Sequence, residues 1–262
     1  MKKGYQKLGY LLVFLVIFSS CELLEGLEGE TGITNEQVVE GLKTALNVGT
    51  DSSVVSLNAA DGYYADAAVK IFLPDEAKVI YDFASYIGGQ SVIEDLVKKI
   101  NRSAEDAAIE AKPIFVSAVT DLTITQGLEI LQGVNVTAKN GRDEFDSLAA
   151  THYLEYKTRT KLKDLFKPKI NTSLGKPLIA GISANSAWST VMGNYNKFAN
   201  TLAGQIAGAT PVTSDLPEYT TDKALNGLFV KIGVQERKIR KDPFQWALDI
   251  LEKVFGSVYQ ES

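Results

Sequence analysis

The chain has 262 residues, of which 45% are hydrophobic and 23% are charged, and its formal net charge at pH 7 is -5. This is the composition of a globular protein with one or two domains. A single histidine and a single cysteine exclude an internal disulfide and a zinc site made of cysteine and histidine ligands, and any Ser-His-Asp triad would have to use the one histidine.

The first twenty residues have the pattern of a secretory signal peptide. Three lysines precede an uncharged, apolar stretch from Leu8 to Phe18, and Ser19 and Ser20 supply the small residues typical of a cleavage site. The apolar stretch is shorter than the roughly 20 residues that a membrane-spanning helix needs. We therefore expect residues 1–20 to direct export and to be removed.

The only cysteine, Cys21, lies directly after this predicted cleavage site. The segment Phe18-Ser19-Ser20-Cys21 resembles the lipobox of bacterial lipoproteins, although Phe18 stands where leucine is usual. The resemblance implies cleavage between Ser20 and Cys21 and acylation of Cys21; the alternative is an ordinary signal peptide followed by a coincidental cysteine. Because two or three acyl chains anchor a protein stably, it also implies a location in the cell envelope, at the periplasmic face or the cell surface.

Loss of the signal peptide makes the chain more acidic. It removes three of the 27 basic residues and none of the 32 acidic ones, so the net charge changes from -5 to −8. This charge argues against nucleic-acid binding. The acidic segment 21–33, which contains several glycines, is typical of a flexible tether.

Helical patterns begin after the tether. Thr34 and Gln37 have the spacing of a capping box, and apolar residues then recur at helical intervals. Residues 61–74 are irregular, and Asp75 is suited to cap a further helix that ends at two glycines.

The next helix is expected to follow Ser91 and to be kinked or broken at Pro113. A short helix from Thr125 to Leu131 is expected to end at Gly133. A long helix is expected over residues 141–166. The remaining expectations are a break at Lys167-Pro168, an apolar helical stripe from Trp188 to Leu202, a loop over 208–217, a helix opening at Thr221 or Asp222, and a last helix after Asp242-Pro243.

These patterns predict an all-α fold, a single multi-helix domain with short irregular connections. Alternating β patterns are rare, no period of 20–50 residues repeats, and no linker rich in proline and glycine divides the helical region. The expected organisation is a signal peptide at 1–20, a lipidated cysteine and tether at 21–33, a helical domain at 34–256 and a C-terminal tail at 257–262.

Several segments occur in an order that matches a known family: Glu110 to Phe115, Gly127 to Gly133, Thr221 to Phe229, Glu236 to Arg240, and Leu251 to Gly256. With them the chain resembles a family of secreted bacterial proteins and lipoproteins, domain of unknown function 4197. The resemblance covers about residues 34–256 and implies an envelope location and a mainly helical domain, but no reaction and no site residues. Asn226 stands where the family often has aspartate.

No constellation typical of an enzyme stands out. His152 lies on the apolar stripe of its predicted helix and is a weak candidate for a general base; packing against a neighbour is the favoured alternative. Asp143, Glu144 and Asp146 lack the order of a calcium-binding loop, so no metal and no cofactor is expected. Ser173 and Lys176 have the Ser-x-x-Lys spacing of penicillin-binding proteins, but the accompanying motifs are absent or misplaced, and a polar loop is expected there.

Two further features leave alternatives open. Trp188, Met192, Tyr195 and Phe198 line one face of a predicted helix and form either a core stripe or the wall of an apolar pocket. Two basic stretches, 157–169 and 231–241, are either solvated helix faces or contacts to anionic lipid or an acidic partner.

The leading functional hypothesis is a cell-envelope lipoprotein that acts as a non-catalytic interaction or structural module. Its expected partners are the membrane, through the lipid anchor, and an envelope protein or lipid, with neither nucleic acid nor metal. The alternative is a binder of an apolar small molecule or lipid in a helical pocket, and the third hypothesis is a hydrolase that depends on carboxylates.

Overall fold

The computed structural model describes residues 34–74, 90–137, 145–179, 181–211 and 215–241. The predictions for the signal peptide, for Cys21, for the helix after Asp75 and for the helix after Asp242-Pro243 fall outside these residues. Within them the chain is helical, which confirms the predicted fold class. The described strands are β1 (Pro177–Ile179) and β2 (Ile182–Ser183), which pair antiparallel as a small ribbon.

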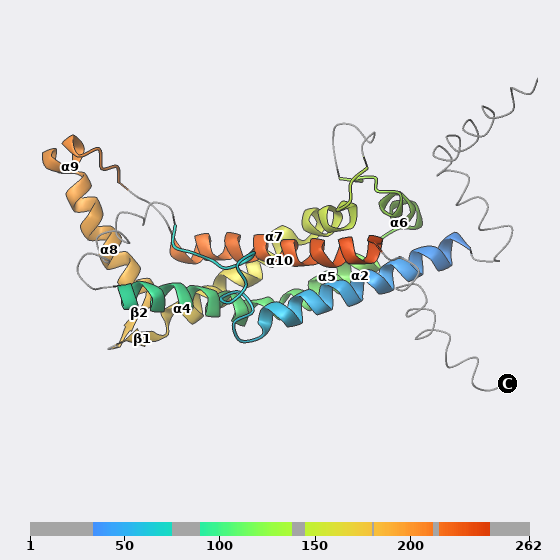
Figure 1. The fold of residues 1–262 in the computed structure, drawn as a ribbon, viewed down its shortest axis with the longest axis horizontal. Helices are drawn as coiled ribbons and strands as arrows, with labels where there is room; N and C mark the ends of the chain where they lie inside the picture. The colour runs from blue at the N-terminus through green and yellow to red at the C-terminus, as the bar shows by residue number, and fades with distance from the viewer. Residues whose placement is uncertain (1–33, 75–89, 138–144, 180, 212–214, 242–262) are drawn as a thin grey trace, which may run out of the picture.

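Four long helices form the body of the molecule: α2 (Asn35–Asn58), α4 (Gln90–Ala108), α7 (Ala149–Gly175) and α10 (Leu216–Lys241). In Figure 1 they run along its long axis, and α7 packs against both α4 and α10. The shorter helices are α5 (Ala111–Thr120), α6 (Ile124–Leu131), α8 (Ala184–Ala199) and α9 (Leu202–Ile206). One cluster of buried side chains runs through the body and includes Leu57, Ile100, Phe115, Leu154, Phe166 and Leu228.

Two local signals at helix ends behave as predicted, and one was missed. Thr34 caps α2 through the predicted capping box with Gln37. The capping box of Thr123 and Gln126 at the start of α6 was not predicted, since the helix was expected to begin at Thr125. Gly133 ends α6 with a φ of 75°. The Gly133 N–H donates to the Ile130 carbonyl, and the Val134 N–H donates to the Glu129 carbonyl. These two hydrogen bonds form a Schellman motif.

The prediction of a break at Lys167-Pro168 is wrong, because α7 continues through Pro168 to Gly175. Pro168 lies on the exposed side of the helix, and the carbonyl that loses its N–H partner belongs to Asp164, which is also exposed. The apolar stripe continues past it at steps of four residues, and each member is fully buried: Leu162, Phe166, Ile170 and Leu174. Burial of this stripe outweighs the roughly 3 kcal/mol cost of an internal proline.

Other boundaries also differ from prediction. The break expected at Pro113 lies at residues 109–110, and Pro113 is in the first turn of α5. The helix expected from Gly141 begins at Ala149, because Asp146 accepts the Leu148 N–H in a turn at 2.8 Å. The helix expected from Thr221 or Asp222 begins at Leu216. There the Asp215 side chain accepts the Glu218 N–H at 3.3 Å, as an N-cap residue does.

In the part of the chain that the structure describes, no single helix is long and apolar enough to cross a membrane. The pair α5 and α6 reaches that length and apolarity only when the two are taken together, and they are bent by 103° at the break between them.

Close packing of α10 against the turn after α2 depends on Gly227. A Cβ atom at this position would lie 2.9 Å from Cε1 of Tyr63 and 3.1 Å from Cβ of Val69, and Tyr63 is fully buried. We expect Gly227→Ala to lower the free energy of unfolding by about 1 kcal/mol, since overpacking costs about 1–3 kcal/mol and exceeds the gain in helix propensity.

Gly193→Ala, in α8, is the matched control. Nothing lies within 4 Å of the added Cβ, so only helix propensity changes, and stability should rise by up to about 1 kcal/mol. Urea denaturation measures both variants; equal effects at the two glycines would contradict the packing argument.

Candidate functional site

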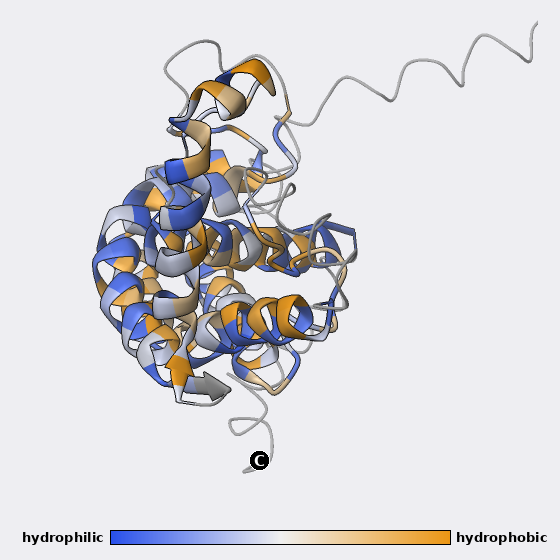
Figure 2. Cartoon of the chain, turned by 90° about the vertical axis from the view of Figure 1, so that its left-hand side faces the viewer, coloured by the Kyte–Doolittle hydropathy of each residue, from blue (hydrophilic) through white to orange (hydrophobic). Residues whose placement is uncertain are grey.

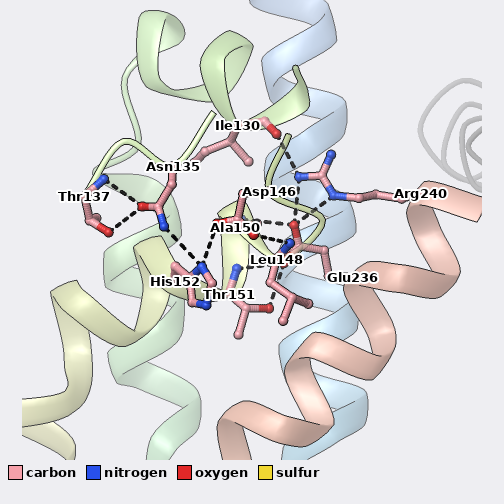
Figure 3. A network of polar contacts seen from close by, with 10 residues as sticks. All are labelled: Ile130, Asn135, Thr137, Asp146, Leu148, Ala150, Thr151, His152, Glu236 and Arg240. Atoms are coloured by element: carbon pink, nitrogen blue, oxygen red, sulfur yellow. Dashed lines mark hydrogen bonds and ion pairs between the residues drawn. The ribbon is translucent and has the colours of Figure 1, made fainter. Parts of the chain in front are cut away.

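A network of polar contacts surrounds the N-terminus of α7 (Figure 3). The Glu236 side chain, only 5% exposed, reaches it from α10. It accepts the N–H of Ala150 at 3.0 Å and the N–H and hydroxyl of Thr151 at 2.8 and 2.7 Å. These N–H groups have no partner within their own helix, so Glu236 acts as an N-cap supplied by another helix.

Arg240 completes this network one helical turn further along α10. Its guanidinium group donates to Glu236 at 2.8 and 2.9 Å. It also donates to the carbonyls of Ile130 and Leu131 at the end of α6, at 2.8 and 3.2 Å. The ion pair of Glu236 and Arg240 therefore binds N–H groups at the N-terminus of α7 and carbonyls at the C-terminus of α6, and it links both helix ends to α10.

His152 lies beside this network in the first turn of α7. Its Nδ1 atom is 2.6 Å from the Asp146 carboxylate and 3.2 Å from the Asn135 amide, and its side chain is 41% exposed. The short contact identifies Nδ1 as the donor to Asp146, which leaves Nε2 as the acceptor in the neutral ring. Among the described residues, no serine, threonine or cysteine hydrogen-bonds to Nε2.

The carboxyl group of Asp146 is held in its charged form. Partial burial raises its pKa, but the hydrogen bonds from His152 and from the Leu148 N–H outweigh this, and the pKa lies below its ordinary value. The stabilisation is present above the ordinary aspartate pKa and is lost as the pH falls through the lowered one. His152 is therefore a half-exposed histidine bonded to a neighbouring carboxylate. Asp143 and Glu144 lie outside the described residues.

A second buried carboxylate has the same role at the turn that follows α2. Glu105, 3% exposed, accepts the backbone N–H groups of Asp61, Tyr63 and Tyr64 at 3.2–3.3 Å. Arg102 pairs with it at 2.5 Å and bridges to Asp61 at 2.8 Å. Asp61 has a φ of 66°, a conformation that is costly for a residue other than glycine, and these hydrogen bonds hold it in place.

Two lysines of the first basic stretch pair with acidic residues at the start of α10. Lys163 contacts Glu218 and Asp222, at 2.5 and 3.0 Å, and Lys167 contacts Glu218 and Asp215, at 2.8 and 3.5 Å. Hydrogen bonds from the two lysines lower the pKa of Glu218, and the carboxylates in turn raise the pKa of both lysines. These contacts line an open groove between the two helices, so the lysines at its centre already have acidic partners.

The Ser-x-x-Lys segment is not the polar loop that was predicted. Ser173, 3% exposed, lies in the last turn of α7, and its hydroxyl donates to Asp106 at 2.8 Å. Lys176 follows the end of that helix. The hydroxyl therefore bonds a carboxylate of α4 in the packed interface.

The residues of the predicted apolar pocket occupy different environments. Trp188 and Met192 are buried at 5% and 6% exposure and belong to the core cluster. Tyr195 packs against the edge of that cluster, and Phe198 is 48% exposed. The structure thus brings two of the four together in the core.

In the described part of the chain, no group of three or more histidine, cysteine, aspartate or glutamate side chains is arranged to hold a metal ion. These features define a helical domain whose buried polar side chains fasten helix ends to one another. The chain belongs to the family described as Protein of unknown function (DUF4197), whose model matches residues 32–256. No curated protein and no solved structure matches the chain.

Proposed function

We propose that this protein is a bacterial cell-envelope lipoprotein, cleaved after Ser20 and acylated at Cys21, whose helical domain is a non-catalytic interaction or structural module. Membership of the family is compatible with this role and names no activity. Support for the proposal comes from the lipobox in the sequence and from the hydrogen bonds of the buried carboxylates.

One observation supports a non-catalytic role: the buried carboxylates already have hydrogen-bond and ion-pair partners within the protein. Among the described residues, the buried charged side chains are Glu105 and Glu236. Each accepts backbone N–H groups and pairs with an arginine. A general acid or base needs an oxygen that faces substrate, and these oxygens face helix ends and a turn. They therefore support a structural role.

The lipobox supports the anchor. Cys21 is the only cysteine of the chain and stands directly after a basic and apolar leader. A thioether-linked diacyl group adds two chains at that position, and two chains are enough for stable attachment.

The direct test is Cys21→Ser in the full chain. We expect the wild-type protein to incorporate a labelled fatty acid and to sediment with membranes after a high-salt wash, and we expect Cys21→Ser to lose the label completely and to leave the washed membrane fraction. The reason is that the sulfur atom of Cys21 carries the diacyl group, and serine lacks that sulfur. Affinity purification of the wild type from detergent-extracted membranes then identifies the envelope proteins and lipids bound to it.

Ser20→Ala is the matched control, since it keeps a small residue before the cleavage site and should retain both the label and the membrane association. Persistent fatty-acid labelling of Cys21→Ser would refute acylation at this position.

A further inference from the structure

Helix α8 and the short helix α9 form an arm, residues 182–211, that projects from one end of the bundle across its long axis (Figures 1 and 2). Trp188 and Met192 fix the base of α8 in the core. Beyond this base the arm leaves the body, and large apolar side chains along it are exposed. Leu202 and Ile206 are 73% and 80% exposed, the highest values among the large apolar side chains that the structure describes.

The tip of the arm has a defined geometry. Thr201 caps α9, because its hydroxyl oxygen accepts the Gly204 N–H at 3.0 Å, and the same hydroxyl donates to the Phe198 carbonyl at 2.7 Å. A Cβ atom at Gly204 would lie 2.2 Å from that carbonyl oxygen, so α9 is packed closely against the end of α8. Leu202 and Ile206, four positions apart in α9, are thereby presented on one face.

The arm is also nearly free of charge. Between Lys176 and Asp215 the only charged side chain is Lys197, although 23% of the whole chain is charged. Asparagine, serine, threonine and glycine supply its polarity instead. A typical protein–protein interface has an apolar centre surrounded by a rim of polar and charged groups. The surface of the arm has almost no charged groups to form such a rim.

We infer that the tip of the arm enters the boundary between headgroups and acyl chains of a phospholipid bilayer, with Leu202 and Ile206 as the inserted side chains. Charged groups are the costly ones at that boundary and apolar side chains are the favoured ones. The one charged side chain of the arm, Lys197, is positive and is attracted to anionic headgroups, which agrees with a bilayer as the partner.

The arm contacts the bilayer that holds the proposed lipid anchor. The arm and the start of α2 lie at opposite ends of the bundle (Figure 1), so both reach one bilayer when the long axis lies along its surface. The tether, residues 21–33, extends at most about 45 Å, which allows this placement. The inference rests on the proposed anchor, which keeps the domain beside the membrane.

The test places a fluorescent label on the arm of the full-length, anchored protein. Acylation blocks the thiol of Cys21, so Leu202→Cys and Ile206→Cys each create a single labelling site. The labelled protein is reconstituted in vesicles of phosphatidylethanolamine and phosphatidylglycerol that contain a nitroxide on the lipid acyl chain. We expect the nitroxide to reduce the emission about twofold or more, because a side chain inserted about 5–10 Å into the boundary lies among the quenchers. Iodide in the water should have little effect.

Val55→Cys is the matched control. Val55 is a 52% exposed valine on α2, and its label should be quenched by iodide and not by the lipid nitroxide. Labels at 202 and 206 that behave like the control, on protein that stays bound to the vesicles, would overturn the inference. Cross-linking of position 202 between two copies without nitroxide quenching would assign the tip to a second copy and would also overturn it. Labelling of the unsubstituted protein, or its failure to bind vesicles, counts against the anchor instead.

Discussion

Replacing Glu236 with glutamine is expected to lower the free energy of unfolding by about 3 kcal/mol, at the lower end of what the loss of one partner of a buried ion pair costs. Glutamine keeps the size of the side chain but replaces one acceptor oxygen with a donor. The N–H groups of Ala150 and Thr151 then compete for the remaining oxygen, and Arg240 loses its charged partner. Urea denaturation with an unchanged slope is the measurement.

Glu155→Gln is the matched control for this substitution. Glu155 also pairs with an arginine four residues along its helix, but it is 35% exposed, and exposed pairs of this kind contribute about 0.3–0.5 kcal/mol. If the two variants lose the same stability, the role of Glu236 as an N-cap supplied by α10 is wrong.

The second large effect is expected at Asn101, which joins α4 to the segment before Pro74. Asn101 is fully buried; its Oδ1 atom accepts the Ile71 N–H at 2.8 Å, and its Nδ2 atom donates to the Ile71 and Val97 carbonyls at 2.7 and 2.8 Å. Asn101→Leu has a similar size but leaves two buried backbone groups of Ile71 without partners. Each costs about 1–3 kcal/mol, so we expect a loss of about 3 kcal/mol or more in thermal or urea unfolding.

Asn226→Ala provides the comparison for Asn101. The exposed Asn226 makes one side-chain hydrogen bond, from Arg159 at 2.6 Å, and its removal should cost less than about 1 kcal/mol. A small loss at Asn101 would show that water replaces the backbone hydrogen bonds at Ile71.

Sequence patterns were sufficient wherever a few neighbouring residues decide the structure. The capping box at Thr34 and the end of α6 at Gly133 depend on residues within one turn of each other. The helical class follows from apolar spacing, which reports burial on one face. Packing against the other helices overrode one local rule: proline disfavours a helix interior, yet α7 passes through Pro168 because the apolar stripe around it is buried.

The polar network could not be predicted in this way. A helix over 141–166 places Asp146 and His152 six residues apart, on different faces; they meet because the chain turns before Ala149. The spacing of Glu236 and Arg240 suggests a pair along one helix. Nothing local shows that their targets are the ends of α7 and α6, roughly 85 to 110 positions earlier in the chain.

The placement of Glu236 and Arg240 near the end of the described chain has a consequence for the order of folding. Synthesis delivers α6 and α7 long before α10, and until α10 arrives the N–H groups of Ala150 and Thr151 and the carbonyl of Leu131 lack the partners that Glu236 and Arg240 supply. The final described helix also packs along α2, the first. An N-terminal fragment that ends before α10 therefore lacks these partners and one wall of the buried core, so we expect the body of the bundle to become stable only after α10 has been made.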